Sequence, residues 1–95
     1  MAAYVIADVT VKDPETYAEY RKHVPATVAK YGGRFLVRGG SHEPLEGAWR
    51  PGRVVVLEFP DMAAARAWYK SQEYGPLLKL RQSASTGHLI LVDGA

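Results

Sequence analysis

Three charged residues interrupt apolar stretches of this sequence, and their side chains are of types that can do chemistry. Asp8, Arg38 and Glu58 each stand in a short segment whose hydrophobic residues alternate as they do in a β-strand. A guanidinium can bind an anion or stabilise an oxyanion, and a carboxylate can accept a proton. If the three segments are neighbouring strands, we expect Arg38 to be the anion partner and Glu58 or Asp8 to be the proton acceptor.

Two other interpretations of these charges stay open. They could form an ion-pair network that only fixes how two subunits assemble, or they could lie at a solvent-exposed rim. A contact between an arginine and a carboxylate at about 4 Å gives roughly 4 kcal/mol before desolvation at an intermediate dielectric. That energy would hold such a network together without any catalysis.

Aromatic residues form a second group of candidates, because many of them fall in the two helical regions of the chain. Most aromatic side chains at helical spacing belong to a core. A buried tyrosine hydroxyl nevertheless needs a hydrogen-bond partner, which a polar ligand could provide. We take Tyr20, Trp68 and Tyr69 as ligand-binding candidates, and we add His88 because it could join the charged face from the last strand.

Four segments of the chain have the composition and alternation of β-strands. The longest β-branched run reads as a central strand that is covered on both faces, and the rest of the chain is organised around it. The four strands are predicted at Ala3–Val11, Arg34–Gly39, Arg53–Phe59 and Gly87–Asp93.

Two helical regions separate these strands. The first is predicted from the N-cap Asp13 to Gly32, with a kink or a break at Pro25, which lacks an N–H group. The second begins at Asp61 and is interrupted near Gly75 before a short helical piece. The order βαββαβ predicts an α+β fold: one ferredoxin-like domain over residues 1–95, with a four-stranded antiparallel sheet and its helices on one face.

This arrangement leaves one face of the sheet bare, and the three charged residues are expected on that face. Its apolar patch, on the order of several hundred Å², would be at or above what soluble monomers expose. A homodimer through this open face would cover it and enclose a dimeric α+β barrel. The expected apolar residues are Ile6, Leu36, Val54, Val56 and either Leu89 with Leu91 or Ile90 with Val92. Two pairs are named for the last strand because alternation does not show which of its two faces is the bare one.

The connection Gly39–Gly52 is longer than the about two to five residues of an ordinary hairpin loop. Loops of this length often carry function. The alternative is a loose hairpin tip in which Leu45 and Trp49 fold back onto the sheet or onto a partner. An exposed, apolar Trp49 would favour a third class of function, a regulator or a subunit of a larger complex.

Several other function classes lack support in the sequence. The 12 basic and 10 acidic residues are spread along the chain, which argues against a nucleic-acid partner. Cysteine is absent and the three histidines are scattered, so no metal site and no cofactor are expected. No stretch approaches the about 20 apolar residues of a membrane span, and no signal peptide or nucleotide-binding motif is present. A soluble cytoplasmic protein without a membrane partner is the expectation.

Several short motifs together resemble one bacterial family. They include Tyr17-x-x-Tyr20, Val24-Pro25, Lys30-Tyr31-Gly32-Gly33, Arg38-Gly39-Gly40, Leu45-Glu46-Gly47, Val55-Val56-Leu57-Glu58-Phe59-Pro60, Ala67-Trp68-Tyr69 and Ser71-x-x-Tyr74. Each motif is weak, but the joint pattern is similar to the family known as domain of unknown function thirteen-thirty over essentially the whole chain. The resemblance implies a ferredoxin-like protomer of the dimeric α+β barrel superfamily, which includes cofactor-free quinol-type monooxygenases, muconolactone isomerases and chlorite-dismutase-like haem proteins. It implies no assigned reaction, and kinship of fold is analogy.

Two hypotheses of different classes follow. The first is a homodimeric small-molecule-binding barrel, which could be a cofactor-free enzyme on an aromatic or carbonyl-bearing substrate. The second is a non-enzymatic dimeric structural or regulatory module, in which the charges only fix the register of assembly. An alanine at Arg38 separates the two, because it should alter ligand uptake in the first and dimer formation in the second.

Overall fold

The computed structural model describes all 95 residues and contains seven regular elements. They are β1 (Ala3–Val11), α1 (Pro14–Lys30), β2 (Arg34–Arg38), β3 (Arg53–Phe59), α2 (Met62–Tyr69), α3 (Gly75–Ala84) and β4 (Ser85–Asp93). The four strands form one antiparallel sheet in the order β2-β3-β1-β4, which is the ferredoxin-like topology expected from the sequence. The helical region after β3 is divided into two helices, α2 and α3.

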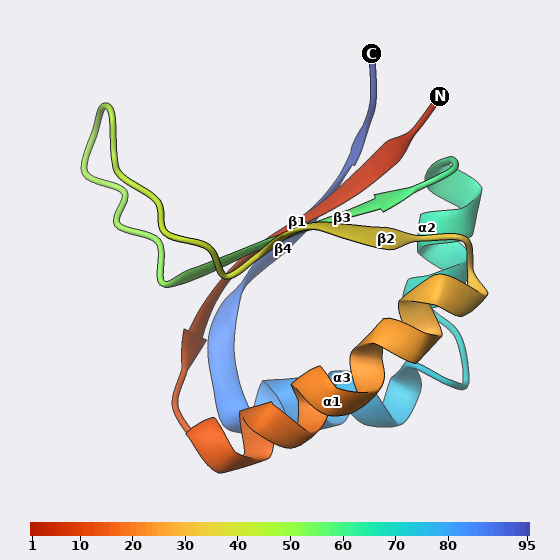
Figure 1. Ribbon diagram of the computed structural model, residues 1–95, viewed down its shortest axis with the longest axis horizontal. Coiled ribbons are helices and arrows are strands. Elements are labelled where there is room, and N and C mark those ends of the chain that lie inside the picture. Colours follow the sequence, from red (N-terminus) through yellow and green to blue (C-terminus); the bar gives the residue numbers. More distant parts are fainter.

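All three helices lie on one face of a strongly curved sheet (Figure 1). The core is packed between the helices and that face, which explains the alternating burial along β1. Three large side chains are almost fully buried in it, namely Phe59, Trp68 and Tyr74. None of the helices has the length and apolarity that a membrane span requires.

Local sequence signals set where the first two helices begin. Asp13 is in an extended conformation and its Oδ1 accepts a hydrogen bond from the Thr16 amide, which satisfies one of the free N–H groups of α1. Pro14 follows at the first helical position, where an N–H is not needed. Asp61 caps α2 in the same way through the Ala64 amide at 2.8 Å.

Helix α1 continues through Pro25 and is not broken there. Proline has no N–H to donate to the carbonyl of Arg21, four residues earlier. That free carbonyl instead accepts a hydrogen bond at 2.8 Å from Nη2 of Arg38, at the end of β2. The acceptor that Pro25 leaves open is therefore satisfied from the sheet.

A β-bulge in β2 overturns the expected position of Arg38. Phe35 is paired with Leu57 of β3, but the register shifts before Val37, which is paired with Val56. One extra residue reverses the facing of the residues beyond it in the strand. Arg38 is consequently opposite Val55, on the helix-covered face, and the prediction that it shares the bare face with Asp8 and Glu58 is wrong.

The pairing of β4 with β1 shows which side chains of β4 face the helices, a point that the sequence left open. Leu89 and Leu91 are opposite Ala7 and Val5, so they belong to the helix-covered face. Ile90 and Val92 are opposite Ile6 and Tyr4 on the bare face. His88 is opposite Asp8 on the same bare face, in agreement with the alternative that places Ile90 and Val92 there.

The long connection between β2 and β3 extends from the sheet as an arm that points away from the helices (Figure 1). Leu45, in this arm, is 87% exposed and Trp49 is 64% exposed. The indole of Trp49 donates a hydrogen bond to Oδ2 of Asp8 at 2.9 Å, which ties the base of the arm to β1. The tip of the arm does not fold back onto the sheet of its own chain (Figure 1).

Candidate functional site

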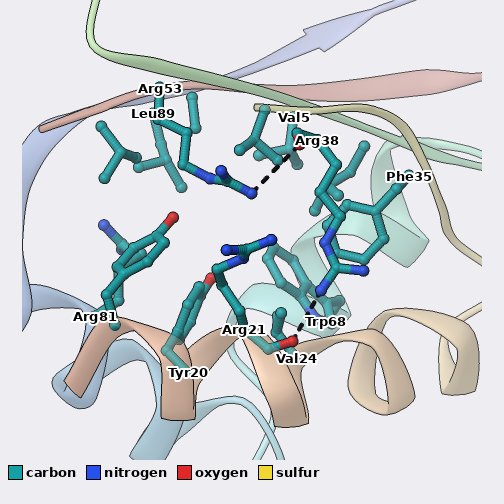
Figure 2. Close-up of a pocket in the computed structure, with 15 residues that line it drawn as sticks. Val5, Tyr20, Arg21, Val24, Phe35, Arg38, Arg53, Trp68, Arg81 and Leu89 are labelled. Carbon is teal, nitrogen blue, oxygen red and sulfur yellow. Dashed lines mark hydrogen bonds between the residues drawn. The ribbon is translucent and has the colours of Figure 1, made fainter. Parts of the chain in front are cut away.

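A pocket lies between α1 and the helix-covered face of the sheet, and Figure 2 shows the side chains around it. Fifteen residues line it, of which eleven are hydrophobic. The space that the centre of a water-sized sphere can reach is about 40 Å³. One bound water needs roughly 10–15 Å³ by that measure, so the enclosed part has room for a group of a few atoms. Its charged residues are all arginines: Arg21, Arg38, Arg53 and Arg81.

Arg53 is the arginine that the sheet itself directs into the pocket. It begins β3 on the same face as Val55 and Leu57, and its guanidinium points into the cavity (Figure 2). Nη2 lies 3.4 Å from the carbonyl of Arg38, and the guanidinium carbon lies 5.8 Å from the centre of the Tyr17 ring. Nε is buried and has no hydrogen-bond partner. A charged donor is therefore left unsatisfied beside the cavity.

Arg38 and Arg21 stand on opposite sides of the pocket and are linked to each other. The guanidinium of Arg38 lies 4.6 Å from the centre of the Phe35 ring, a cation–π arrangement that holds its direction. Its Nη2 bonds to the Arg21 carbonyl, as described above, and the Arg21 side chain points into the cavity (Figure 2). Both side chains are exposed, so these two arginines mark the open end of the pocket.

A chain of hydrogen bonds forms the inner wall. The hydroxyls of Tyr20 and Tyr74 are 3.0 Å apart, and Nε of the buried Arg81 donates to the Tyr74 hydroxyl at 3.3 Å. Burial raises the pKa of Tyr20 well above its usual value, and the neighbouring Tyr74 adds to the effect. The hydroxyl of Tyr20 is therefore an even weaker acid than that of a free tyrosine, and at neutral pH it can serve the pocket only as a neutral hydrogen-bonding group.

The lining of the pocket contains no carboxylate and no histidine. The four arginines take part in none of the ion pairs of the structure, all of which involve other cations. The site is therefore suited to binding an anion or to stabilising negative charge, and it has no group to act as a general base at neutral pH. Guanidinium groups repel a metal ion, and nowhere do three metal-ligating side chains gather.

The two predicted proton acceptors lie on the other side of the sheet. Asp8 accepts hydrogen bonds from the indole of Trp49 and from the amide of Gly52, both at 2.9 Å, and these bonds lower its pKa. Glu58 is paired with Arg34, whose Nε lies 2.7 Å from Oε1. Neither carboxylate reaches Arg38, so the expected catalytic cluster of Asp8, Arg38 and Glu58 does not form. The bulge in β2 turns Arg38 away from this face, and the pairing of β1 with β3 places Asp8 opposite Val54 but Glu58 opposite Tyr4, four residues further along the strand.

The predicted ligand-binding residues divide between three places. Tyr20 and Trp68 line the pocket between α1 and the sheet. The Trp68 indole also donates a hydrogen bond to Oγ1 of Thr27 at 3.0 Å. Tyr69 lines a separate hollow between α2 and β4. His88 lies on the bare face opposite Asp8.

Sequence reasoning missed Arg21, Arg53 and Arg81. Arg53 had a signal, because it has the same parity in β3 as Val55 and Leu57 and so had to face the helices. Arg21 follows Tyr17 at helical spacing, which places it near the buried stripe of α1. For Arg81 there was no comparable signal, since its burial depends on how α3 packs against α1.

The order of the strands and the helices on one face define a ferredoxin-like α+β protein with a pocket between its two layers. The family follows from the sequence: residues 2–95 match the domain of unknown function DUF1330, and the chain belongs to that family. The resemblance of its motifs to this family is thereby confirmed. A search of curated proteins finds no match.

Solved structures share the fold at low identity. A protein of unknown function from Rhodopseudomonas palustris, RPA0582, is 20% identical with a TM-score of 0.81, over 99% of this chain and 82% of that one. SnoaB, a cofactor-independent oxygenase from Streptomyces nogalater, is 18% identical with a TM-score of 0.64, over 99% and 92%. An antibiotic biosynthesis monooxygenase is also 18% identical, with a TM-score of 0.54, over 100% and 99%. These likenesses establish the fold.

Proposed function

We propose that this protein is a homodimeric small-molecule-binding barrel whose ligand enters the pocket between α1 and the sheet. The observation that carries the proposal is the composition of that pocket, which has apolar walls, a few convergent polar groups and an unsatisfied buried donor on Arg53. Small-molecule sites have this character, whereas a packed core leaves no such donor.

The same groups support a cofactor-free enzyme on an aromatic or carbonyl-bearing substrate. Arginine side chains would stabilise negative charge on a substrate oxygen, and the neutral hydroxyl of Tyr20 would form a hydrogen bond with the substrate. No side chain in the pocket would remove a proton, so the substrate would have to be acidic itself. SnoaB, a cofactor-independent oxygenase, gives a precedent for catalysis without a cofactor on this fold, by analogy only.

Assembly through the bare face of the sheet is the second part of the proposal. Apolar side chains of β4 are freely exposed there, with Ile90 56% and Val92 38% accessible. Ile6, Val54 and Val56 belong to the same face through their pairing. Two copies placed face to face would remove this patch from water.

Alanine at Arg38 tests the pocket against the alternative of a non-enzymatic dimeric module. Ligand binding is followed by the shift of the unfolding temperature with a panel of phenols, aromatic ketones and aromatic acids. We expect the Arg38→Ala dimer to stay intact and to lose the shift given by the best compound. The matched control is Arg34→Ala, which removes an arginine of the same strand from the bare face and should keep the shift. A dissociated Arg38→Ala protein, or no compound that binds the wild type, would favour the module.

Sedimentation velocity at micromolar concentration tests the dimer. An aspartate in place of Ile90 puts a charge within the proposed contact, so Ile90→Asp should sediment as a monomer. Ser83→Asp, on the exposed surface of α3, adds the same charge elsewhere and should sediment as the wild type does. A monomeric wild-type protein would refute this part of the proposal.

A further inference from the structure

We propose that the pocket is selective for a small organic carboxylate, held through the guanidinium of Arg53 with Arg21 and Arg38 at its open end. This inference rests on the proposed function and adds the chemical class of the ligand. It depends on three features of the pocket: an excess of positive charge, a pair of adjacent N–H donors on Arg53 that lacks good acceptors, and a small volume.

The charge of the pocket calls for an anion. Four guanidinium groups line it, and arginine stays protonated at any pH at which the protein is folded. Arg81 is buried and Arg53 is half-buried, and such charges are normally paired because the loss of water is otherwise costly. Arg21 and Arg38 are exposed and add positive charge at the open end. No carboxylate of the chain is within the lining, and the hydrogen-bond partners of these guanidinium groups are carbonyls and a tyrosine hydroxyl. A bound anion would supply the missing countercharge.

The geometry of Arg53 favours a carboxylate. Its Nε–H is buried without a partner, and the neighbouring Nη2 makes only a long bond of 3.4 Å to the carbonyl of Arg38. Two adjacent N–H donors match the two oxygens of a carboxylate, which they bind through parallel hydrogen bonds. The Tyr20 hydroxyl on the opposite wall can donate as well when Tyr74 is the donor of the bond between the two hydroxyls.

The enclosed part of the pocket is large enough only for the head group of a ligand, so the rest of the ligand would lie nearer the open end. The enclosed space has room for about three water molecules, which is close to the size of a carboxylate group with its attached carbon. The remainder of the ligand would lie toward Arg21 and Arg38, against the apolar side chains of Val24 and Phe35. An aromatic or branched aliphatic body fits this environment, whereas inorganic phosphate would leave the apolar surface unused.

Isothermal titration calorimetry of the full chain with phenylacetate and phenylacetamide tests the inference, because the two compounds have the same body and differ only in the head group, a carboxylate or a neutral amide of similar size. We expect phenylacetate to bind at least about tenfold more tightly, the ratio typical of a charge-assisted hydrogen bond in place of a neutral one. Equal binding of both compounds would overturn the carboxylate inference and leave the proposed function standing. Binding of neither compound would overturn the carboxylate inference, whereas the proposed function would fall only if no compound of the panel of phenols, aromatic ketones and aromatic acids bound either. Inorganic phosphate that binds as tightly as phenylacetate would overturn the selectivity for an organic acid.

Variants locate the binding site. Arg53→Gln removes the charge and most of the fork, and it should weaken phenylacetate binding by about tenfold or more while phenylacetamide is little changed. Arg50→Gln, in the exposed arm, is the matched control and should bind as the wild type does. If Arg53→Gln does not fold, Arg21→Gln at the solvent-exposed open end of the pocket replaces it, with the same expected direction. Unchanged phenylacetate affinity in the folded variant would refute the assignment.

Discussion

The hydroxyls of Tyr20 and Tyr74 form a hydrogen bond with each other, but we expect them to contribute very different amounts to the free energy of unfolding. Tyr74 is fully buried and its hydroxyl has two partners, the Tyr20 hydroxyl at 3.0 Å and Nε of Arg81 at 3.3 Å. The Tyr20 hydroxyl has only one partner. The structure therefore makes Tyr74 the centre of this small network.

The expected costs depend on the polar groups that each phenylalanine leaves unpaired. Tyr20→Phe removes one hydrogen bond but leaves the Tyr74 hydroxyl bonded to Arg81, which should lower the free energy of unfolding by about 0.5–1.5 kcal/mol. Tyr74→Phe leaves both the Tyr20 hydroxyl and the Arg81 Nε without a partner in a buried site, and the cost should be about 2–4 kcal/mol. For a chain of this length each kcal/mol corresponds to roughly 4–8 °C in the midpoint of thermal unfolding.

Urea denaturation at one fixed protein concentration measures these differences, since association would make the stability depend on concentration. Tyr31→Phe is the control, because its hydroxyl donates to Glu73 at the surface and its loss should cost less than about 0.5 kcal/mol. Equal costs for Tyr20→Phe and Tyr74→Phe, or a larger cost for Tyr20→Phe, would refute the arrangement in which Tyr74 bridges to Arg81.

Two further predictions concern a glycine and a surface carboxylate. Gly39 has a φ of 71°, a conformation that is strained for a residue with a Cβ, so Gly39→Ala should destabilise the protein by about 1–2 kcal/mol in urea; the added Cβ would also clash with Nη1 of Arg53 and displace the guanidinium. Gly40→Ala meets nothing within 4 Å and should change stability little; equal costs would contradict this reasoning. The hydrogen bond from Lys30 lowers the pKa of Glu73 to about 2, so its stabilising effect is complete above the unfolded pKa of about 4.3 and is lost as the pH falls toward 2. Glu73→Gln should therefore flatten the decline of stability between those pH values in acid unfolding, and an unchanged slope would count against the ion pair.

Much of the fold could be predicted from the sequence because its strands have a strict period of two. Alternation in β1 correctly separates Val5, Ala7 and Val9 from the residues of the bare face. The capping residues Asp13 and Asp61 likewise mark where two helices begin. These signals are local, and local rules are sufficient to read them.

The site could not be predicted to the same degree, because its residues depend on where alternation fails. The bulge between Phe35 and Val37 has no glycine or proline to announce it. Without the bulge, Arg38 would face away from the helices with Arg34, as the sequence suggested. Alternation along β3 already indicated that Arg53 faces the helices together with Val55 and Leu57. A charged residue at the end of an apolar strand is nevertheless easily taken for a solvent-exposed one.

Two irregularities of the chain that local rules treat as separate defects meet in one contact. Pro25 removes a hydrogen bond from α1 and leaves the carbonyl of Arg21 free, while the bulge in β2 turns Arg38 toward that helix. Arg38 then satisfies the free carbonyl at 2.8 Å. A regular β2 would leave the carbonyl without this donor, and a regular α1 would leave Arg38 without this anchor. The pairing of the two defects fixes an arginine at the entrance of the pocket, which explains why a proline in the middle of a helix is compatible with a continuous α1.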